Sequence, residues 1–183
     1  MKKVTLLGDS IRLGYGQKVP ALLRGEYAVF QPEDNCRFAK YTLRGLFEWR
    51  EQIEGSDVIH WNNGMWDVSD LFGDGYFSPL EEYRANIKRI AELLLKITPK
   101  VIFATTTPVR DGYMYQTNDD IRLFNDTVTP MLSDMGVVIN DLFQTVYPQR
   151  IVYIREDDKL HLNDAGIDIC ANQVANCIRK VSC

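Results

Sequence analysis

The sequence has no long apolar run. No stretch approaches the roughly 18 apolar residues that cross a bilayer, which excludes a transmembrane helix. The apolar run near the N-terminus extends only from Val4 to Leu7, and no small-residue cleavage site follows it. That run is too short for the hydrophobic region of a signal peptide. We therefore expect a cytoplasmic protein that has no membrane partner.

Cysteine is scarce. Cys36, Cys170, Cys177 and Cys183 include no CxxC pair, and Cys170 and Cys177 lie on one predicted helix at a spacing that prevents a mutual disulfide. This pattern excludes a disulfide scaffold. It indicates free thiols in a reducing compartment.

Basic residues are not in excess. The chain has 21 Lys and Arg against 25 Asp and Glu, so its net charge is −4. Phosphate backbones require a concentrated basic face, and anionic lipids attract basic segments. We therefore expect no nucleic-acid partner, and the charge supplies no attraction to a membrane.

Phosphate-binding motifs are also missing. Gly8, Gly14 and Gly16 match neither GxGxxG nor the P-loop spacing, and no lysine follows in the required place. Asp9 has no second carboxylate beside it, which argues against metal-dependent phosphoryl transfer. A nucleotide- or phosphate-binding α/β protein is therefore a weak alternative.

What the sequence does contain is a regular alternation of short apolar runs and longer amphipathic ones. Its 183 residues fit a single domain, 1–183. The pattern predicts strands at 3–7, 27–30, 57–61, 101–104 and 137–139, and helices near 13–24, 42–53, 79–97 and 119–135 and after Asn163. Ser78-Pro79-Leu80-Glu81 is typical of a capping box, Asn118 and Asn163 are expected caps, and Pro130 is expected to bend its helix.

Strands that alternate with helices predict a parallel sheet covered on both faces. The predicted fold class is α/β, a flavodoxin-like three-layer α/β/α sandwich with a five-stranded parallel sheet. In such folds ligands bind beyond the carboxyl ends of the strands. The loops after the first, third and fifth strands are therefore where a site is expected.

Gly8-Asp9-Ser10 follows the first predicted strand. Gly8 permits a tight turn, and Ser10 is then exposed at the edge of the sheet near a helix start, where backbone N–H groups are available to an anion. The alternative is an ordinary helix cap, because Ser and Asp are common at helix starts.

Asp158-Lys159-Leu160-His161 precedes the last predicted helix. The three-residue spacing lets one turn bring the carboxylate to one ring nitrogen, so that the other nitrogen can take a proton from a hydroxyl. The alternative is a surface turn before a capped helix. The only other histidine, His60, lies within an apolar strand and is expected to be a hydrogen-bonded core residue.

Together, Gly8-Asp9-Ser10 and Asp158-x-x-His161 resemble the SGNH, or GDSL-type, hydrolase family, and they span nearly the whole chain. The resemblance implies a flavodoxin-like sheet and a Ser-His-Asp esterase. By position, Ser10 would be the nucleophile, His161 the general base and Asp158 its orienting acid. No metal and no organic cofactor is expected.

Two inner motifs depart from the family pattern. Lys40 stands where a glycine normally lends its N–H to the oxyanion hole beside that of Ser10; the N–H survives, but the side chain is expected to narrow the pocket. Trp66 occupies the asparagine position of Gly-x-Asn-Asp. Asn62 or Asn63 is expected to supply the missing side-chain amide of the oxyanion hole, and Asn62 is preferred. The alternative is that both asparagines only stabilise the turn before Gly64.

The remaining substrate-binding candidates are Asp9, Arg12, Asn63 and Trp66. Arg12 either contacts a substrate carboxylate or is a solvated arginine at a helix start. Aromatic residues from Trp66 to Phe77, together with Tyr113 and Tyr115, suit carbohydrate binding beside acidic residues; the alternative is that they pack on the rim of the sheet.

The sequence therefore predicts a serine esterase that hydrolyses small acyl esters, with O-acetyl groups on carbohydrate as a candidate substrate. Its expected partner is a small-molecule acyl ester or an acylated sugar. The alternative is a catalytically weak or inactive relative that binds a glycan or a partner through the same cleft. Covalent labelling of Ser10 by an organophosphonate separates the two.

Overall fold

Five short apolar runs form one parallel sheet in the computed structural model, which describes residues 1–182. The strand order is β2-β1-β3-β4-β5, the flavodoxin-like order. The strands are β1 (Lys2–Leu7), β2 (Tyr27–Phe30), β3 (Val58–Trp61), β4 (Val101–Ala104) and β5 (Val138–Asn140). The predicted fold class is confirmed.

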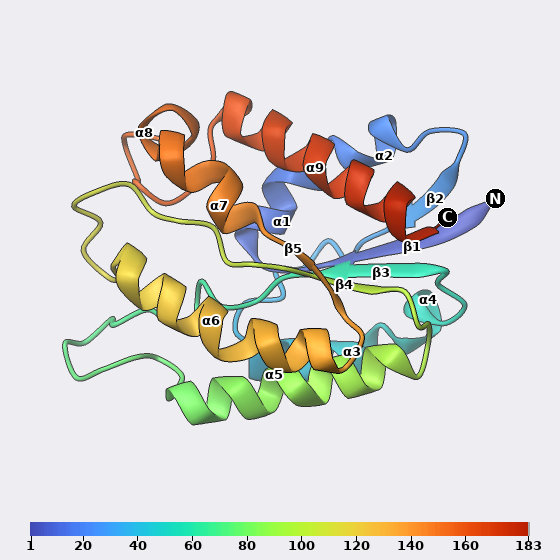
Figure 1. Cartoon of the computed structure of the whole chain (residues 1–183), viewed down its shortest axis with the longest axis horizontal. Helices are drawn as coiled ribbons and strands as arrows, with labels where there is room; N and C mark the ends of the chain where they lie inside the picture. Colours follow the sequence, from blue (N-terminus) through green and yellow to red (C-terminus); the bar gives the residue numbers. More distant parts are fainter. Residues whose placement is uncertain (183) are drawn as a thin grey trace.

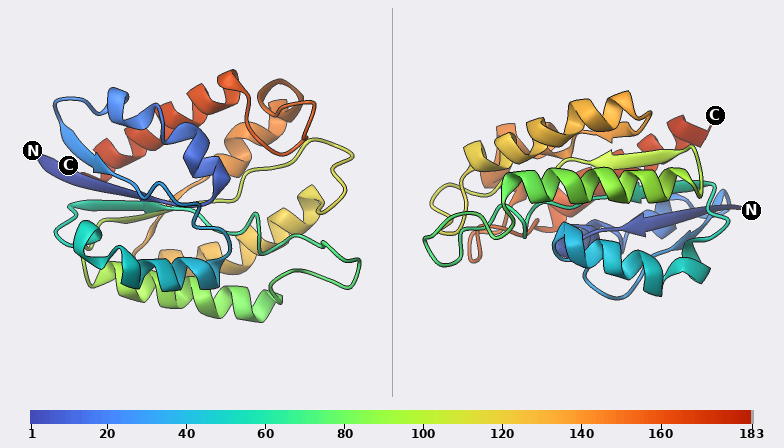
Figure 2. Two further views of the ribbon diagram at one scale, coloured as in Figure 1. Left: turned by 180° about the vertical axis from the view of Figure 1, so that it is seen from behind. Right: turned by 90° about the horizontal axis from the view of Figure 1, so that it is seen from below.

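Helices cover both faces of this sheet, as Figures 1 and 2 show. One face carries α1 (Ser10–Tyr15), α2 (Val19–Leu22), α7 (Leu142–Val146), α8 (Arg150–Tyr153) and α9 (Asp164–Ser182), with a short 3₁₀ turn at Tyr147–Gln149. The other face carries α3 (Ala39–Glu48), α4 (Arg50–Ile53), α5 (Leu80–Leu95) and α6 (Asn118–Asp134). Every residue of the central strands β3 and β4 is buried, because helices cover both of their sides.

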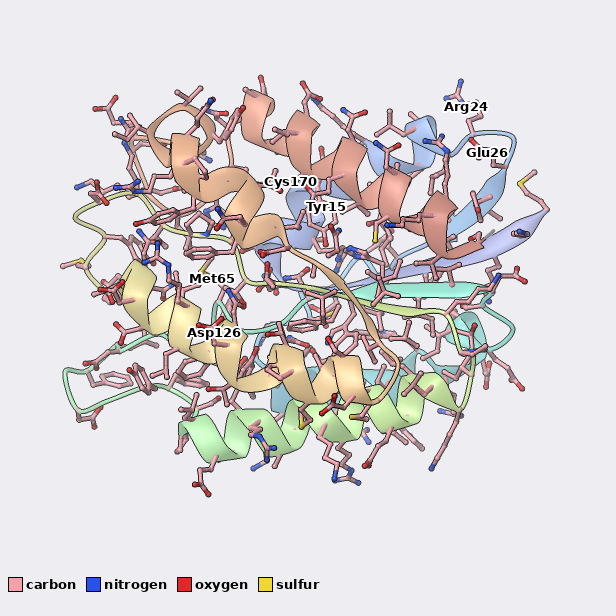
Figure 3. All side chains as sticks on the ribbon, viewed as in Figure 1. Tyr15, Arg24, Glu26, Met65, Asp126 and Cys170 are labelled. Atoms are coloured by element: carbon pink, nitrogen blue, oxygen red, sulfur yellow. The ribbon has the colours of Figure 1, made fainter. Side chains whose placement is uncertain are left out.

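The core also holds residues with polar or reactive groups. Tyr15 on α1 and Cys170 on α9 (labelled in Figure 3) are both fully buried. His60 is buried, its Nε2 lies 3.1 Å from Asn140 Nδ2, and burial lowers the pKa of its ring to about 3. The prediction of a hydrogen-bonded core histidine is confirmed.

Two predicted helices are each divided in the structure. The segment near 13–24 forms α1 and α2, and α1 begins already at Ser10 because Asp9 accepts the N–H of Ile11. Helix α1 ends at its C-cap residue Gly16, whose N–H donates to the Arg12 carbonyl. The segment near 42–53 forms α3 and α4, which meet at Trp49.

The predicted cap at Ser78 is wrong. The Ser78 hydroxyl donates to Asp67 Oδ1 at 2.7 Å, and α5 starts at Leu80 with Pro79 before it and no side-chain cap. A tertiary acceptor therefore competes successfully with the local capping box.

The cap of α6 is also one residue from its predicted place. Thr117 and Asp120 form a capping box, whereas the Asn118 side chain bonds both the N–H and the carbonyl of Val109. The prediction for α9 is confirmed, because Asn163 Oδ1 accepts the Gly166 N–H at 3.0 Å. Pro130 lies inside α6.

The described cysteines are free thiols. Cys36 and Cys170 are buried and Cys177 is partly buried, whereas Cys183 lies outside the described residues. Within residues 1–182, no helix is both long and apolar enough to cross a bilayer.

Candidate active site

Residues from the two ends of the chain meet at the carboxyl edge of the sheet. Ser10 follows β1 as the first residue of α1, and His161 lies in the loop before α9. Ser10 Oγ is 3.0 Å from His161 Nε2, and His161 Nδ1 is 3.0 Å from Asp158 Oδ2. These contacts form one continuous chain from hydroxyl to imidazole to carboxylate, which is the geometry that activates a weak nucleophile.

A single tight turn holds the acid beneath the ring. Asp158 Oδ1 accepts the backbone N–H groups of Leu160 and His161, each at 2.9 Å, and Lys159 between them has a φ of +59°. Partial burial acts to raise the pKa of the Asp158 carboxyl, but these N–H groups and the His161 ring outweigh it and leave that pKa below its usual value. The carboxylate therefore stays ionised near neutral pH and can orient the ring.

Ser10 and His161 open into a cleft of about 400 Å³. Apolar side chains form most of its wall: Met65, Trp66, Leu71, Phe77, Tyr113 and Leu160. Asn35, Ser69 and Gln116 add polar groups. A larger cavity of about 850 Å³ lies between α3, α4 and α5, beside the segments that lead into β3 and β4, and its lining contains no serine, cysteine or histidine.

Two loops that follow β3 and β4 are joined across this cleft, and they project from the carboxyl edge of the sheet in Figure 1. The Asp70 N–H donates to the Tyr115 carbonyl at 2.7 Å, and Ser69 Oγ donates to Gln116 Oε1 at 2.7 Å. Trp66 keeps 39% of its surface exposed at the cleft. The aromatic residues therefore form a wall that remains open to a ligand.

Arg12 does not reach the cleft. Its side chain is 1% exposed, and its guanidinium donates to the carbonyls of Pro32 at 2.9 Å, Asp34 at 2.6 Å and Gly8 at 3.2 Å. Both predicted alternatives, a substrate contact and a solvated arginine, are wrong. The residue instead ties α1 to the loop after β2.

Asp9 and Asn62 lie in a buried network behind Ser10. Asp9 accepts hydrogen bonds from Asn62 Nδ2 at 2.9 Å and from the Ile11 N–H at 3.0 Å. Burial raises the pKa of the Asp9 carboxyl, and this effect is larger than the opposite effect of the two hydrogen bonds. Asn62 Oδ1 accepts from Tyr15 at 3.1 Å. Gly8 (φ +155°) is required here, because a Cβ would overlap Asn62 Oδ1. Asp9 therefore caps a helix instead of binding substrate, and one Asn62 amide hydrogen is engaged below the cleft.

Asn63 and Lys40 also differ from expectation. Asn63 is fully buried and its Nδ2 donates to the Arg37 carbonyl at 3.0 Å, so it does not line the cleft. The Lys40 side chain is exposed and pairs with Glu82 at 3.0 Å, so it does not narrow the cleft. The Lys40 backbone lies in the first turn of α3.

Two backbone donors remain available at helix starts. The N–H groups of Ser10 and Lys40 have no hydrogen-bond acceptor among residues 1–182. The N-terminal N–H groups of a helix carry partial positive charge and favour an anion. These donors are therefore suited to a developing oxyanion.

Sequence reasoning gave no role to Asp67, although it ends the Asn-Asn-Gly-Met-Trp-Asp stretch. It is fully buried, accepts the Ala39 N–H, and has its pKa raised to about 6 by burial. Its only sequence signal is an acidic residue in the loop after a buried strand. No group of three or more His, Cys, Asp or Glu side chains within residues 1–182 is arranged to hold a metal ion.

Known proteins are similar to this chain in sequence and in fold. No family model matches the chain. It is 25% identical to a GDSL esterase/lipase of Oryza sativa subsp. japonica, over 91% of this chain and 68% of the rice protein. It is 22% identical to a GDSL esterase/lipase of Arabidopsis thaliana, over 97% of this chain and 79% of the Arabidopsis protein.

The fold matches a solved acetyl xylan esterase with a TM-score of 0.81 at 17% identity, covering 96% of this chain and 99% of that one. The plant relatives and this shared fold agree with the Gly8-Asp9-Ser10 and Asp158-x-x-His161 motifs. The chain is therefore similar in sequence and fold to the SGNH, or GDSL-type, hydrolases, and this similarity supports an enzyme that acts on ester bonds.

Proposed function

We propose that Ser10, His161 and Asp158 are the catalytic triad of an esterase that removes small acyl groups. O-acetyl groups on carbohydrate are the substrate we favour, and residues 1–183 act as one catalytic domain. The observation that carries this proposal is the unbroken hydrogen-bond chain Ser10 Oγ–His161 Nε2 and His161 Nδ1–Asp158 Oδ2, each link 3.0 Å long.

In the proposed reaction Ser10 Oγ attacks the ester carbonyl carbon while His161 Nε2 takes the hydroxyl proton. The Asp158 carboxylate stabilises the imidazolium that forms. The tetrahedral intermediate collapses, His161 gives the proton to the departing alcohol oxygen, and an acyl-Ser10 ester remains. Water, deprotonated by His161, then attacks the acyl-enzyme and releases the acid.

The oxyanion of each tetrahedral intermediate requires donors that are already in place. We assign this role to the backbone N–H groups of Ser10 and Lys40, which stand at the starts of two different helices. Each such donor is worth about 10²–10³ in rate. The second amide hydrogen of Asn62 is a further candidate, because only one is engaged with Asp9.

The cleft supports the choice of substrate. Its volume of about 400 Å³ suits a short acyl group joined to a ring-sized alcohol. Trp66, Phe77 and Tyr113 present aromatic surface beside Ser10, on which the apolar face of a sugar ring can pack. The fold shared with an acetyl xylan esterase agrees with this choice.

The test compares wild type with Ser10→Ala on p-nitrophenyl acetate and on acetylated xylo-oligosaccharides. We expect kcat/KM to fall by about 10³-fold or more in Ser10→Ala, because the nucleophile is lost. Ser69→Ala is the matched control: it removes another hydroxyl from the same cleft, and we expect it to lose less than about tenfold.

Two outcomes would contradict the proposal. Equal rates for wild type and folded Ser10→Ala would show that another group performs the hydrolysis. A wild type that neither turns over esters nor becomes labelled at Ser10 by an organophosphonate would instead favour a binding protein that uses the same cleft.

A further inference from the structure

Helix α3 begins without a cap of its own. Phe38 occupies the N-cap position and offers no side-chain acceptor. The missing acceptor comes from the loop after β3, where both Asp67 oxygens accept the Ala39 N–H, at 3.0 Å and 3.2 Å, from 28 residues away. A tertiary contact therefore sets the direction of the first turn of α3.

Asp67 is held rigidly for this task. It is fully buried, its Oδ1 accepts the Ser78 hydroxyl at 2.7 Å, and its carbonyl accepts the Ser78 N–H at 2.9 Å. Burial raises the pKa of its carboxyl to about 6, although the bonds from Ser78 and Ala39 act in the opposite direction. A buried carboxyl is costly, and groups of this kind gather at functional sites.

The segment that leads into α3 is fixed at two further points. The Cys36 N–H donates to the Gly8 carbonyl at 3.0 Å, which joins this segment to the end of β1. Asn63 Nδ2 donates to the Arg37 carbonyl at 3.0 Å, and Arg37 has a φ of +48°. A non-glycine residue in this region carries strain of about 1 kcal/mol or more, which the surrounding bonds must hold.

Lys40 follows directly after the pinned Ala39. Its own N–H has no acceptor among residues 1–182, and it is one of the donors assigned above to the oxyanion. Successive peptide units of one helical turn have a fixed relative orientation. The direction of the Ala39 N–H therefore determines the direction of the Lys40 N–H.

We propose that Asp67 is a positioning residue for ester hydrolysis: by accepting the Ala39 N–H it holds the Lys40 N–H in line with the substrate oxyanion. This proposal rests on the esterase function proposed above. Asp67 touches no substrate, and it acts on the transition state through one backbone donor. Its loss should therefore lower kcat and leave KM nearly unchanged.

The test is Asp67→Leu, which keeps a similar shape but cannot accept a hydrogen bond. We expect kcat on p-nitrophenyl acetate to fall about 10- to 100-fold, because a misdirected donor costs less than the about 10²–10³ of a lost one. KM should stay within about twofold. Affinity for phenylboronic acid, which forms a tetrahedral adduct on Ser10, should fall in parallel with kcat.

Two further variants separate positioning from support of the fold. Asp67→Asn keeps an oxygen for Ala39 and an amide for Ser78 Oγ, so kcat should recover to within about threefold of wild type. Ser78→Ala removes the other side-chain contact of the same carboxylate, so it should lower the melting temperature but leave kcat within about twofold. Folding of each variant is checked by circular dichroism and by its melting temperature.

An unchanged kcat in folded Asp67→Leu overturns the proposal. An Asp67→Asn variant as slow as Asp67→Leu also overturns it, because charge and not the acceptor would then matter. If Asp67→Leu does not fold, the decision passes to Asp67→Asn and Ser78→Ala: the proposal requires Ser78→Ala to retain kcat. A wild type with no turnover and no labelling at Ser10 defeats the esterase proposal itself, whereas an active wild type with an insensitive Asp67 defeats only this inference.

Discussion

Two layers of polar residues surround Ser10, and they differ in exposure and in what they bond. The cleft layer, Asp158 and His161, is partly exposed, and its side chains bond one another and Ser10. The layer behind it, which includes Asp9, Arg12 and Asp67, is at most 1% exposed and bonds mainly backbone groups.

The difference separates chemistry from support. A partly exposed group can meet substrate and exchange a proton with it, whereas a fully buried group cannot reach substrate. The pKa values follow the same division: that of Asp158 lies below its usual value because backbone N–H groups favour the anion, and that of Asp67 is raised to about 6 by burial. Residues adjacent to Ser10 in sequence therefore need not line the same cleft.

The largest effect is expected from the cleft layer. Asp158→Asn keeps an oxygen for the Leu160 and His161 N–H groups but presents an amide to the ring, which favours the wrong tautomer. We expect kcat on p-nitrophenyl acetate to fall by about 10²–10⁴. Asp157→Asn, which changes the adjacent exposed carboxylate, is the matched control and should retain activity. Equal activity in both variants would remove Asp158 from the triad.

A large stability effect is expected from the buried layer. Arg12→Met leaves the carbonyls of Gly8, Pro32 and Asp34 without their donor, and we expect the free energy of unfolding to fall by about 3 kcal/mol. Urea unfolding measures this as a lower midpoint at constant slope. Arg24→Met is the control: Arg24 extends into solvent (Figure 3), so its change should stay within about 0.5 kcal/mol.

The Arg12→Met variant also tests whether Arg12 belongs to the buried layer or to the cleft layer. If Arg12 bound a substrate carboxylate, Arg12→Met would discriminate against esters with an anionic acyl chain. We expect anionic and neutral esters of similar size to lose kcat/KM by the same factor. A selective loss for the anionic ester would move Arg12 into the cleft layer.

The smallest effect is expected at the cleft wall. Trp66→Ala removes aromatic surface beside Ser10, and we expect KM for an acetylated xylo-oligosaccharide to rise about fivefold, equivalent to about 1 kcal/mol. Phe72→Ala is the control, because Phe72 is 83% exposed on the same loop and does not line the cleft. Equal KM values for both variants would show that the wall does not bind the sugar.

The strands and the fold class could be predicted because they depend on apolar runs that any core must bury. The helix starts were less predictable, because they depend on tertiary contacts. Asp67 accepts the first N–H of α3, and the Ser78 hydroxyl donates to the same carboxylate instead of capping α5. Asp9 and Arg12 could not be placed from sequence for a related reason. In the sequence, a polar residue beside Ser10 gives the same signal whether its side chain faces the cleft or the core.

The apolar pattern of the chain dictates the alternation of strands and helices, and with it the edge of the sheet at which Ser10 and His161 meet. Local spacing also determined the Asp158–His161 turn, because one turn of chain is enough to form it. Which polar side chains remain open to the cleft depends instead on tertiary packing. Burial depends on elements distant in sequence, and a buried donor or acceptor must bond whatever backbone group packs against it.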